Sequence, residues 1–193
     1  MSCSVYRLRK EVEGTQTIFI GIDPGLTGAL VAINDQRKIL FCDDAPTLQN
    51  TKFNSLRREY DRLRMVDMLR EILHKRDEHG EPFACMEKVN AMPNTGSIGN
   101  FSLGQGFGIW LGILATLKVP IDLVHSKTWK KAMMPDMGKE KQASIIRAKE
   151  LFPADEVFFR FKYHHGRADA LLIAEWRRRQ ENFASHTAAA TAS

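Results

Sequence analysis

The sequence has few cysteines and no pattern typical of a disulfide or zinc framework. Its three cysteines, Cys3, Cys42 and Cys85, are odd in number and lack metal-ligand spacing, which excludes the common cysteine-based scaffolds. Cys42 and Cys85 lie in apolar runs and are expected to be reduced core thiols, as in the cytosol. Residues 1–16 lack the apolar core of a secretory signal and contain two glutamates, so we interpret them as a loose N-terminal extension.

Long apolar runs and internal repeats are also missing. No run approaches the roughly 20 residues of a membrane span, so we expect no membrane contact. With 193 residues, 44% hydrophobic and 26% charged, the chain suits one soluble domain. We place that domain at residues 17–182 and expect residues 183–193 to form a flexible tail.

Basic residues exceed acidic ones and gather in clusters. The net charge is +5, and clusters occur at residues 57–58, 62–64, 127–131, 139–141 and 177–179. Clustered lysine and arginine favour a polyanionic partner, although a solvated helix face is the commoner origin of any single cluster.

The most informative stretch is the apolar segment from Ile18 to Ile33. A short apolar run ends at Asp23, Pro24-Gly25 and Gly28 indicate a tight turn, and a second apolar run follows. We expect a β-hairpin with Asp23 at its mouth and glycines that supply the φ angles that the turn needs. In the simplest alternative, Asp23 only caps the turn.

The remaining elements follow from hydrophobic spacing and turn residues. In the first half we expect a strand at 38–42, a loop at 47–54, a helix from Ser55 to near Gly80, and a strand at 83–86. Irregular chain follows to about Leu103, then a helix carrying Gly104, Gly108 and Gly112 in one row, and a strand at 120–124. In the last part we expect a helix over Ser126–Met133 capped by Ser126, a helix over Lys139–Leu151 with Ala143, Ile146 and Leu151 inward, and a last helix around Ala168–Trp176. The glycine row would let a partner subunit or the sheet approach closely.

This order of elements predicts the fold class. Three strands joined by short turns pair antiparallel, and strands that follow helices can lie parallel. We therefore expect an α/β protein with a mixed five-stranded sheet flanked by helices.

Three carboxylates stand at element ends that the predicted sheet would bring to one edge. Asp23 ends the first strand, Glu87 ends the fourth, and Asp169 opens the last helix. Converging carboxylates repel one another unless a divalent cation binds, and oxygen ligands suit Mg²⁺. Separately, a strand end explains Glu87 and the helix dipole explains Asp169, while His164 and His165 fit a surface role.

At this point the sequence resembles a known family. GIDPGLTGALVAI, MEKV and HHGRADALLIAEW resemble the motifs of RuvC-type Holliday junction resolvases, particularly their phage and plastid relatives. The segments LVHSKTWKKAM and KEKQASIIRAKELFP resemble the family's basic segments, so the likeness spans about residues 17–177. It implies an RNase H-like fold, a homodimer matched to a four-way DNA junction, and two Mg²⁺ ions per site that Mn²⁺ can replace.

The resemblance also implies roles for particular residues. Asp23, Glu87 and Asp169 would hold the metals, with His165 as a fourth member. Many members place an acid or histidine three residues before the last aspartate, but that position is Gly166 here, so whether His164, His165 or neither joins the site stays open. The residues implied in DNA binding are Lys88, Asn90, Phe101, Lys127, Lys130, Lys131 and Arg167. Phe101 would stack on an unpaired base, or else be a core residue.

The implied activity is symmetric, metal-dependent nicking of four-way junctions that leaves 5′-phosphate and 3′-hydroxyl ends. Two other classes stay open: a non-catalytic module that binds branched DNA, and a phosphate-binding ATPase fragment, because the Asp-Pro-Gly hairpin also resembles the loop of sugar kinases and actin. We expect no small-molecule substrate, and a cytoplasmic, nucleoid-associated location in a bacterium or phage-infected cell rather than in a plastid.

Overall fold

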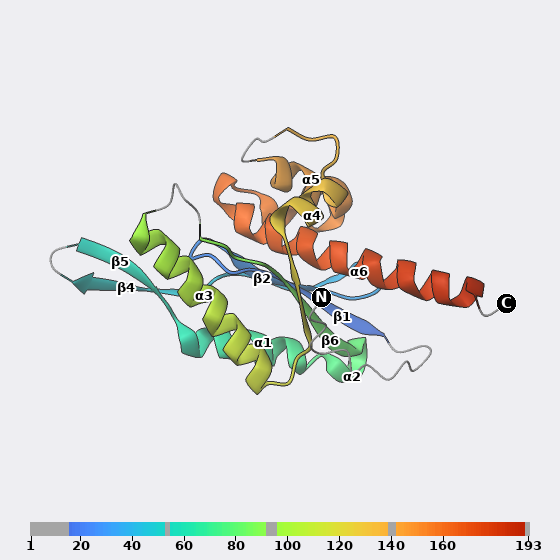
Figure 1. Cartoon of the computed structure of the whole chain (residues 1–193), viewed down its shortest axis with the longest axis horizontal. Coiled ribbons are helices and arrows are strands. Elements are labelled where there is room, and N and C mark those ends of the chain that lie inside the picture. The colour runs from blue at the N-terminus through green and yellow to red at the C-terminus, as the bar shows by residue number, and fades with distance from the viewer. Residues whose placement is uncertain (1–15, 53–54, 92–95, 139–141, 192–193) are drawn as a thin grey trace.

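The chain folds as a mixed five-stranded sheet between two layers of helices (Figure 1). The computed structural model describes residues 16–52, 55–91, 96–138 and 142–191. The sheet comprises β1 (Thr17–Asp23), β2 (Ala29–Ile33), β3 (Ile39–Asp44), β6 (Glu81–Glu87) and β7 (Ile121–Val124). Their order is β3-β2-β1-β6-β7, with β1, β2 and β3 antiparallel and β6 and β7 parallel to β1. The predicted fold class is confirmed.

Helices cover both faces of this sheet. On one side lie α1 (Arg62–Leu73), α2 (Arg76–His79) and α3 (Ser97–Thr116); on the other lie α4 (Ser126–Met133), α5 (Ala143–Leu151) and α6 (His165–Thr191). Two short 3₁₀ helices, η1 (Pro153–Phe159) and η2 (Lys162–His164), connect α5 to α6.

Alternation along β1 fills both cores. Ile18, Ile20 and Ile22 pack toward α1 and α3, whereas Phe19 packs toward α5 and α6. All four side chains are fully buried, as expected for a central strand with helices on both faces. This packing fixes the strand on which the first acidic residue stands.

The segment from Thr47 to Tyr60 differs from the prediction. It forms an antiparallel hairpin of β4 (Thr47–Lys52) and β5 (Ser55–Tyr60), which extends beyond the main sheet (Figure 1). The predicted loop and the helix start at Ser55 are therefore wrong. The helix instead begins after Asp61, whose carboxylate accepts a hydrogen bond from the Arg64 backbone at 3.1 Å.

Helix α3 is longer and more exposed than predicted. It begins at Ser97, within the stretch expected to be irregular, because intrahelical hydrogen bonds outweigh the cost of its glycines. By length and composition alone it is also apolar enough to cross a membrane, so the expectation that no run has this character is wrong. Nothing lies within 4 Å of the Cβ positions of Gly104, Gly108 and Gly112, so the glycine row does not pack on the sheet.

Smaller differences concern the C-terminal helices. Helix α5 begins at Ala143, residues 139–141 of the predicted helix lie outside the described residues, and Ile145 rather than Ile146 faces inward. Helix α6 continues to Thr191, through most of the stretch where a flexible tail is predicted.

Candidate active site

Asp23 is held at the first turn by backbone contacts. It ends β1, and the Gly25 amide donates to its Oδ1 at 3.4 Å, while the Gly28 amide donates to the Gly25 carbonyl at 2.9 Å. A Cβ on Gly28 would lie 2.1 Å from the Asp23 carbonyl oxygen, so the absence of a side chain at Gly28 lets the backbone turn close against Asp23. The predicted φ role is wrong, because Gly80 is the sole glycine with positive φ in the described part of the chain.

Strand register brings Glu87 beside Asp23. Strands β1 and β6 run parallel with Ile22 paired to Met86, so the next residues, Asp23 and Glu87, emerge at the same end of the sheet. The structure therefore brings these two predicted residues together, as the order of elements suggested.

Helix α6 brings the third carboxylate, Asp169, to this end of the sheet. A Cβ on Gly21 would lie 1.9 Å from the Ala170 carbonyl oxygen, so α6 touches the backbone of β1 directly. The neighbouring Asp169 accepts a hydrogen bond from the Ser144 hydroxyl of α5, and its negative charge raises the pKa of both Asp23 and Glu87.

Burial, with help from neighbouring negative charge at two of them, raises the proton affinity of the three carboxylates. Burial, then the charge of Asp169 and that of Glu87, raise the pKa of Asp23 from 3.8 to about 7. Burial also raises the pKa of Glu87 and that of Asp169, while the Lys130 ammonium lowers all three. Carboxylates with perturbed pKa values cluster at functional sites, because catalytic groups need pKa values matched to their task.

Helix α4 orients Glu87. The buried Trp129 indole donates from Nε1 to Glu87 Oε2 at 2.9 Å, and the Ser126 side chain also hydrogen-bonds to this carboxylate. Ser126 is therefore the first helical residue, facing the site, and His125 occupies the N-cap position predicted for it. The Lys130 ammonium lies 5.1 Å from the Trp129 ring centroid.

The two histidines have different surroundings. His164 is only 6% exposed and packs edge-on against Phe161 and Tyr163, whereas the charge of His165 lowers the pKa of Asp169. The Gly166 amide donates to His165 Nδ1 at 2.9 Å, so the neutral form of this ring carries its proton on Nε2. At position 166, a Cβ would lie 2.2 Å from the Thr27 carbonyl oxygen, so a larger residue does not fit there.

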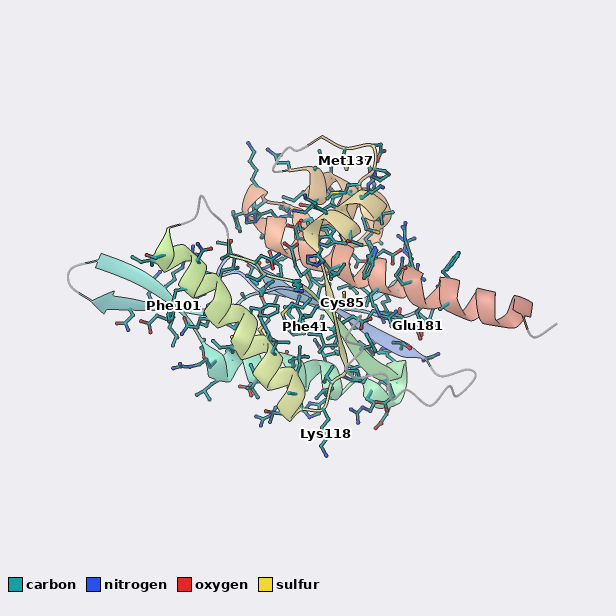
Figure 2. The ribbon with its side chains drawn as sticks, viewed as in Figure 1. Phe41, Cys85, Phe101, Lys118, Met137 and Glu181 are labelled. Carbon is teal, nitrogen blue, oxygen red and sulfur yellow. The ribbon has the colours of Figure 1, made fainter. Side chains whose placement is uncertain are left out.

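The predicted DNA-binding residues divide into two groups. Lys88, Asn90, Lys127, Lys130 and Lys131 are exposed, and Phe101 is 74% exposed at the hairpin side of the molecule (Figure 2), so it is not a core residue.

Arg167 differs from the exposed DNA-binding candidates, because its guanidinium is paired inside the protein. Its Nε and Nη2 donate to the two carboxylate oxygens of Asp44 at 2.7 and 2.8 Å, and this bidentate pair joins α6 to the end of β3. The structure therefore engages Arg167 within the protein rather than presenting it free to DNA.

Several contacting residues were missed from the sequence. Ser144 and Trp129 hold carboxylates, and the Tyr60 hydroxyl lies 3.1 Å from the Pro24 carbonyl and 3.2 Å from that of Ser102. Trp129 lies in the basic segment LVHSKTWKKAM. A single tryptophan among its lysines was the sequence feature that could have marked Trp129 as a site residue.

The donor set fits a hard divalent cation by its chemistry. Three carboxylates supply oxygen ligands, and their pKa values are raised, first by burial, so a bound cation would favour their ionised forms. Within the described ranges, no three His, Cys, Asp or Glu side chains are close enough to form a preassembled metal site. The carboxylates would therefore have to move toward a bound cation.

Replacing Trp129 by Phe should weaken divalent-metal binding. Loss of the indole donor removes a hydrogen bond that favours the ionised form of Glu87, so we expect about tenfold lower affinity for Mg²⁺ or Mn²⁺ by titration calorimetry. Trp110→Phe is the matched control, because Trp110 is also fully buried and its Nε1 has no hydrogen-bond partner. Equal affinities in the two variants would contradict a supporting role for Trp129.

The metal-free protein should lose stability as pH rises. The folded state keeps a proton on Asp23 that the unfolded chain releases between the two pKa values, so this contribution is full below about pH 4 and is lost as pH rises through about 7. We expect the melting temperature in EDTA to fall from about pH 5 to about pH 8, and to fall less in Asp23→Asn. Parallel curves for the two proteins would contradict a raised pKa at Asp23.

Comparison with known proteins agrees with this architecture. No protein-family model matches the sequence. The chain is 36% identical over 94 residues to the chloroplastic Holliday junction resolvase MOC1 of Chlamydomonas reinhardtii, and this match covers 49% of the chain and 11% of that protein. RuvC of T. thermophilus, solved with a Holliday junction substrate, matches with a TM-score of 0.55 and 17% identity, covering 84% of this chain and 92% of that one. The chain therefore has the RNase H-like fold of RuvC, and its resemblance to RuvC-type resolvases is confirmed.

Proposed function

We propose that the chain is a metal-dependent endonuclease that resolves four-way DNA junctions. The observation that carries the proposal is that Asp23, Glu87 and Asp169 come from three elements to one end of the sheet, where all three have raised pKa values and the Lys130 ammonium acts on each of them. The two proteins reported above, a resolvase and RuvC bound to a junction, support the choice of DNA substrate.

The three carboxylates would hold the metal ions, two Mg²⁺ per site with Mn²⁺ as a substitute. These ions would supply an activated water and charge stabilisation for an in-line displacement. The charge of His165 acts on Asp169, so His165 would donate from Nε2–H to a water or phosphate oxygen in this conformation, and metal ligation through Nε2 would require the other tautomer.

The products follow from which phosphorus–oxygen bond breaks. The water oxygen bonds to phosphorus as the bond to the 3′-oxygen breaks, and that oxygen takes up a proton. The resulting ends are a 5′-phosphate and a 3′-hydroxyl. Lys130 would contact the scissile phosphate, because its charge acts on all three carboxylates.

DNA affinity would come from exposed groups around the carboxylates. Lys127 and Lys131 on α4, and Lys88 and Asn90 after β6, would contact phosphates. The exposed Phe101 ring would stack on a base near the junction centre. The cellular location stays a prediction; the curated relative is a chloroplastic protein.

Asp23→Asn should abolish nicking of a synthetic four-way junction in Mg²⁺, at least about a hundredfold, while junction binding in EDTA stays within about threefold. Asp169→Ala and His165→Ala should also lose cleavage and keep binding. Linear duplex, flap and RNA:DNA hybrid are tested beside the junction. Lys118→Gln is the matched control, because Lys118 lies at the far end of α3 (Figure 2).

Each alternative has its own outcome in that assay. Wild-type protein that binds junctions but nicks nothing would favour the non-catalytic module. ATP hydrolysis without cleavage would favour the ATPase fragment. Undiminished nicking by Asp23→Asn would remove Asp23 from the mechanism.

The homodimer is proposed from the exposed face of α3. Ile98 is 71% exposed, and the row of Gly104, Gly108 and Gly112 is open, so a second α3 can approach its backbone closely. A two-fold dimer would present two sites to two strands of like polarity.

Gly108→Glu should convert the dimer to a monomer. The new carboxylate would be buried opposite its own copy at the two-fold axis, where like charges repel. Analytical ultracentrifugation at micromolar concentration measures the mass, and Gly138→Glu, at another open position, is the control. A wild-type monomer, or a dimer that tolerates Gly108→Glu, would contradict this interface.

A further inference from the structure

Two exposed aromatic rings lie at the start of η2, outside the carboxylate site. Phe161 and Tyr163 are 48% and 65% exposed, and their rings stack with centroids 5.2 Å apart and planes 10° apart. Exposed rings in parallel are unusual on a soluble surface unless a partner covers them.

A buried histidine holds this pair in place. The His164 ring meets Phe161 at 79° and Tyr163 at 87°, with centroids 5.2 and 4.6 Å away, and His164 is itself 6% exposed. Because the rings are already fixed by a buried side chain, stacking a flat ligand on them costs little further conformational entropy.

Positive charge alternates with the rings. Arg160 and Lys162 are exposed and directly precede Phe161 and Tyr163 in sequence. The neighbouring carboxylate, Glu156, is paired with the Lys149 ammonium at 2.6 Å, so it only partly offsets Arg160. A flat ring beside a cation matches a nucleotide, whose base stacks while its phosphate is anionic.

The position of η2 relates these rings to the carboxylates. Residue 164 ends η2 and residue 165 begins α6, which carries His165 and Asp169. The Arg167–Asp44 pair ties this end of α6 to β3, at one edge of the sheet, while the lysines of α4 follow β7 at the other edge. The aromatic pair and the lysines therefore flank the carboxylates from opposite edges.

We propose that Arg160–Tyr163 form a second DNA-binding surface, in which Phe161 and Tyr163 stack on an unpaired base and Arg160 and Lys162 contact the adjoining phosphates. The proposal rests on the proposed function in one respect, that the chain binds DNA. It adds a strand contact on the β3 side of the site.

The test measures binding of the full chain in EDTA by fluorescence anisotropy, with a labelled single-stranded oligonucleotide and a four-way junction. Replacing Phe161 and Tyr163 together by Leu should weaken single-strand binding about fivefold or more, because leucine keeps the packing on His164 but removes the stacking face. Tyr163→Phe, which keeps the ring, should stay within about twofold. Arg160→Gln with Lys162→Gln should reduce the slope of log affinity against log salt by about one to two.

Phe183→Leu is the matched control. Phe183 is 74% exposed and lies 18 residues beyond His165 on the same helix, about 27 Å away. Thermal melting by circular dichroism checks that each variant is folded.

The outcomes separate this proposal from the proposed function. If wild-type protein binds no DNA, the proposed function itself fails. If wild-type protein binds DNA and the double leucine variant binds equally well, the second surface is refuted. A changed sedimentation mass in that variant at unchanged DNA affinity would assign the rings to a protein contact instead, which also overturns the proposal.

Discussion

The direct contact between helix α6 and strand β1 determines the geometry of the whole site. Gly21 permits it, since a single methyl group there would lie 1.9 Å from the Ala170 carbonyl oxygen. At the N-terminal end of the same helix, Gly166 lies equally close to the turn after Asp23. These two backbone contacts bring Asp169 to the edge where β1 and β6 end, so the placement of the third carboxylate follows from close packing rather than from attraction between acids.

Gathering three carboxylates in a half-buried site opposes folding, and the protein offsets this only in part. Trp129 and Ser126 donate to Glu87, Ser144 donates to Asp169, and the Lys130 ammonium lowers the pKa of all three carboxylates. The pKa of Asp23 nevertheless remains near neutrality. A site that stays short of positive charge is suited to a cation that arrives from solution.

The basic residues that suggested a polyanionic partner serve two purposes. Glu175 is 1% exposed and accepts hydrogen bonds from Arg178 and Arg179, so the cluster at the end of the last predicted helix neutralises a buried acid. Arg167 likewise pairs with Asp44. Arginine, with its planar fork, provides these internal pairs, whereas the lysines of α4 are exposed and the charge of Lys130 acts on the carboxylates. Sequence clusters alone do not distinguish the two uses.

The sequence by itself determined the five-stranded sheet and the strand ends at Asp23 and Glu87, because apolar runs and turn residues act locally. It misassigned the hairpin from Thr47 to Tyr60, since Leu56 and Tyr60 have helical spacing while the pairing that makes them a strand is with residues before them. Only the tertiary structure decided which histidine stands beside Asp169, that Trp129 holds Glu87, and that Phe101 is exposed. Those facts depend on which faces of separate helices meet, and periodicity along one segment carries no information about that.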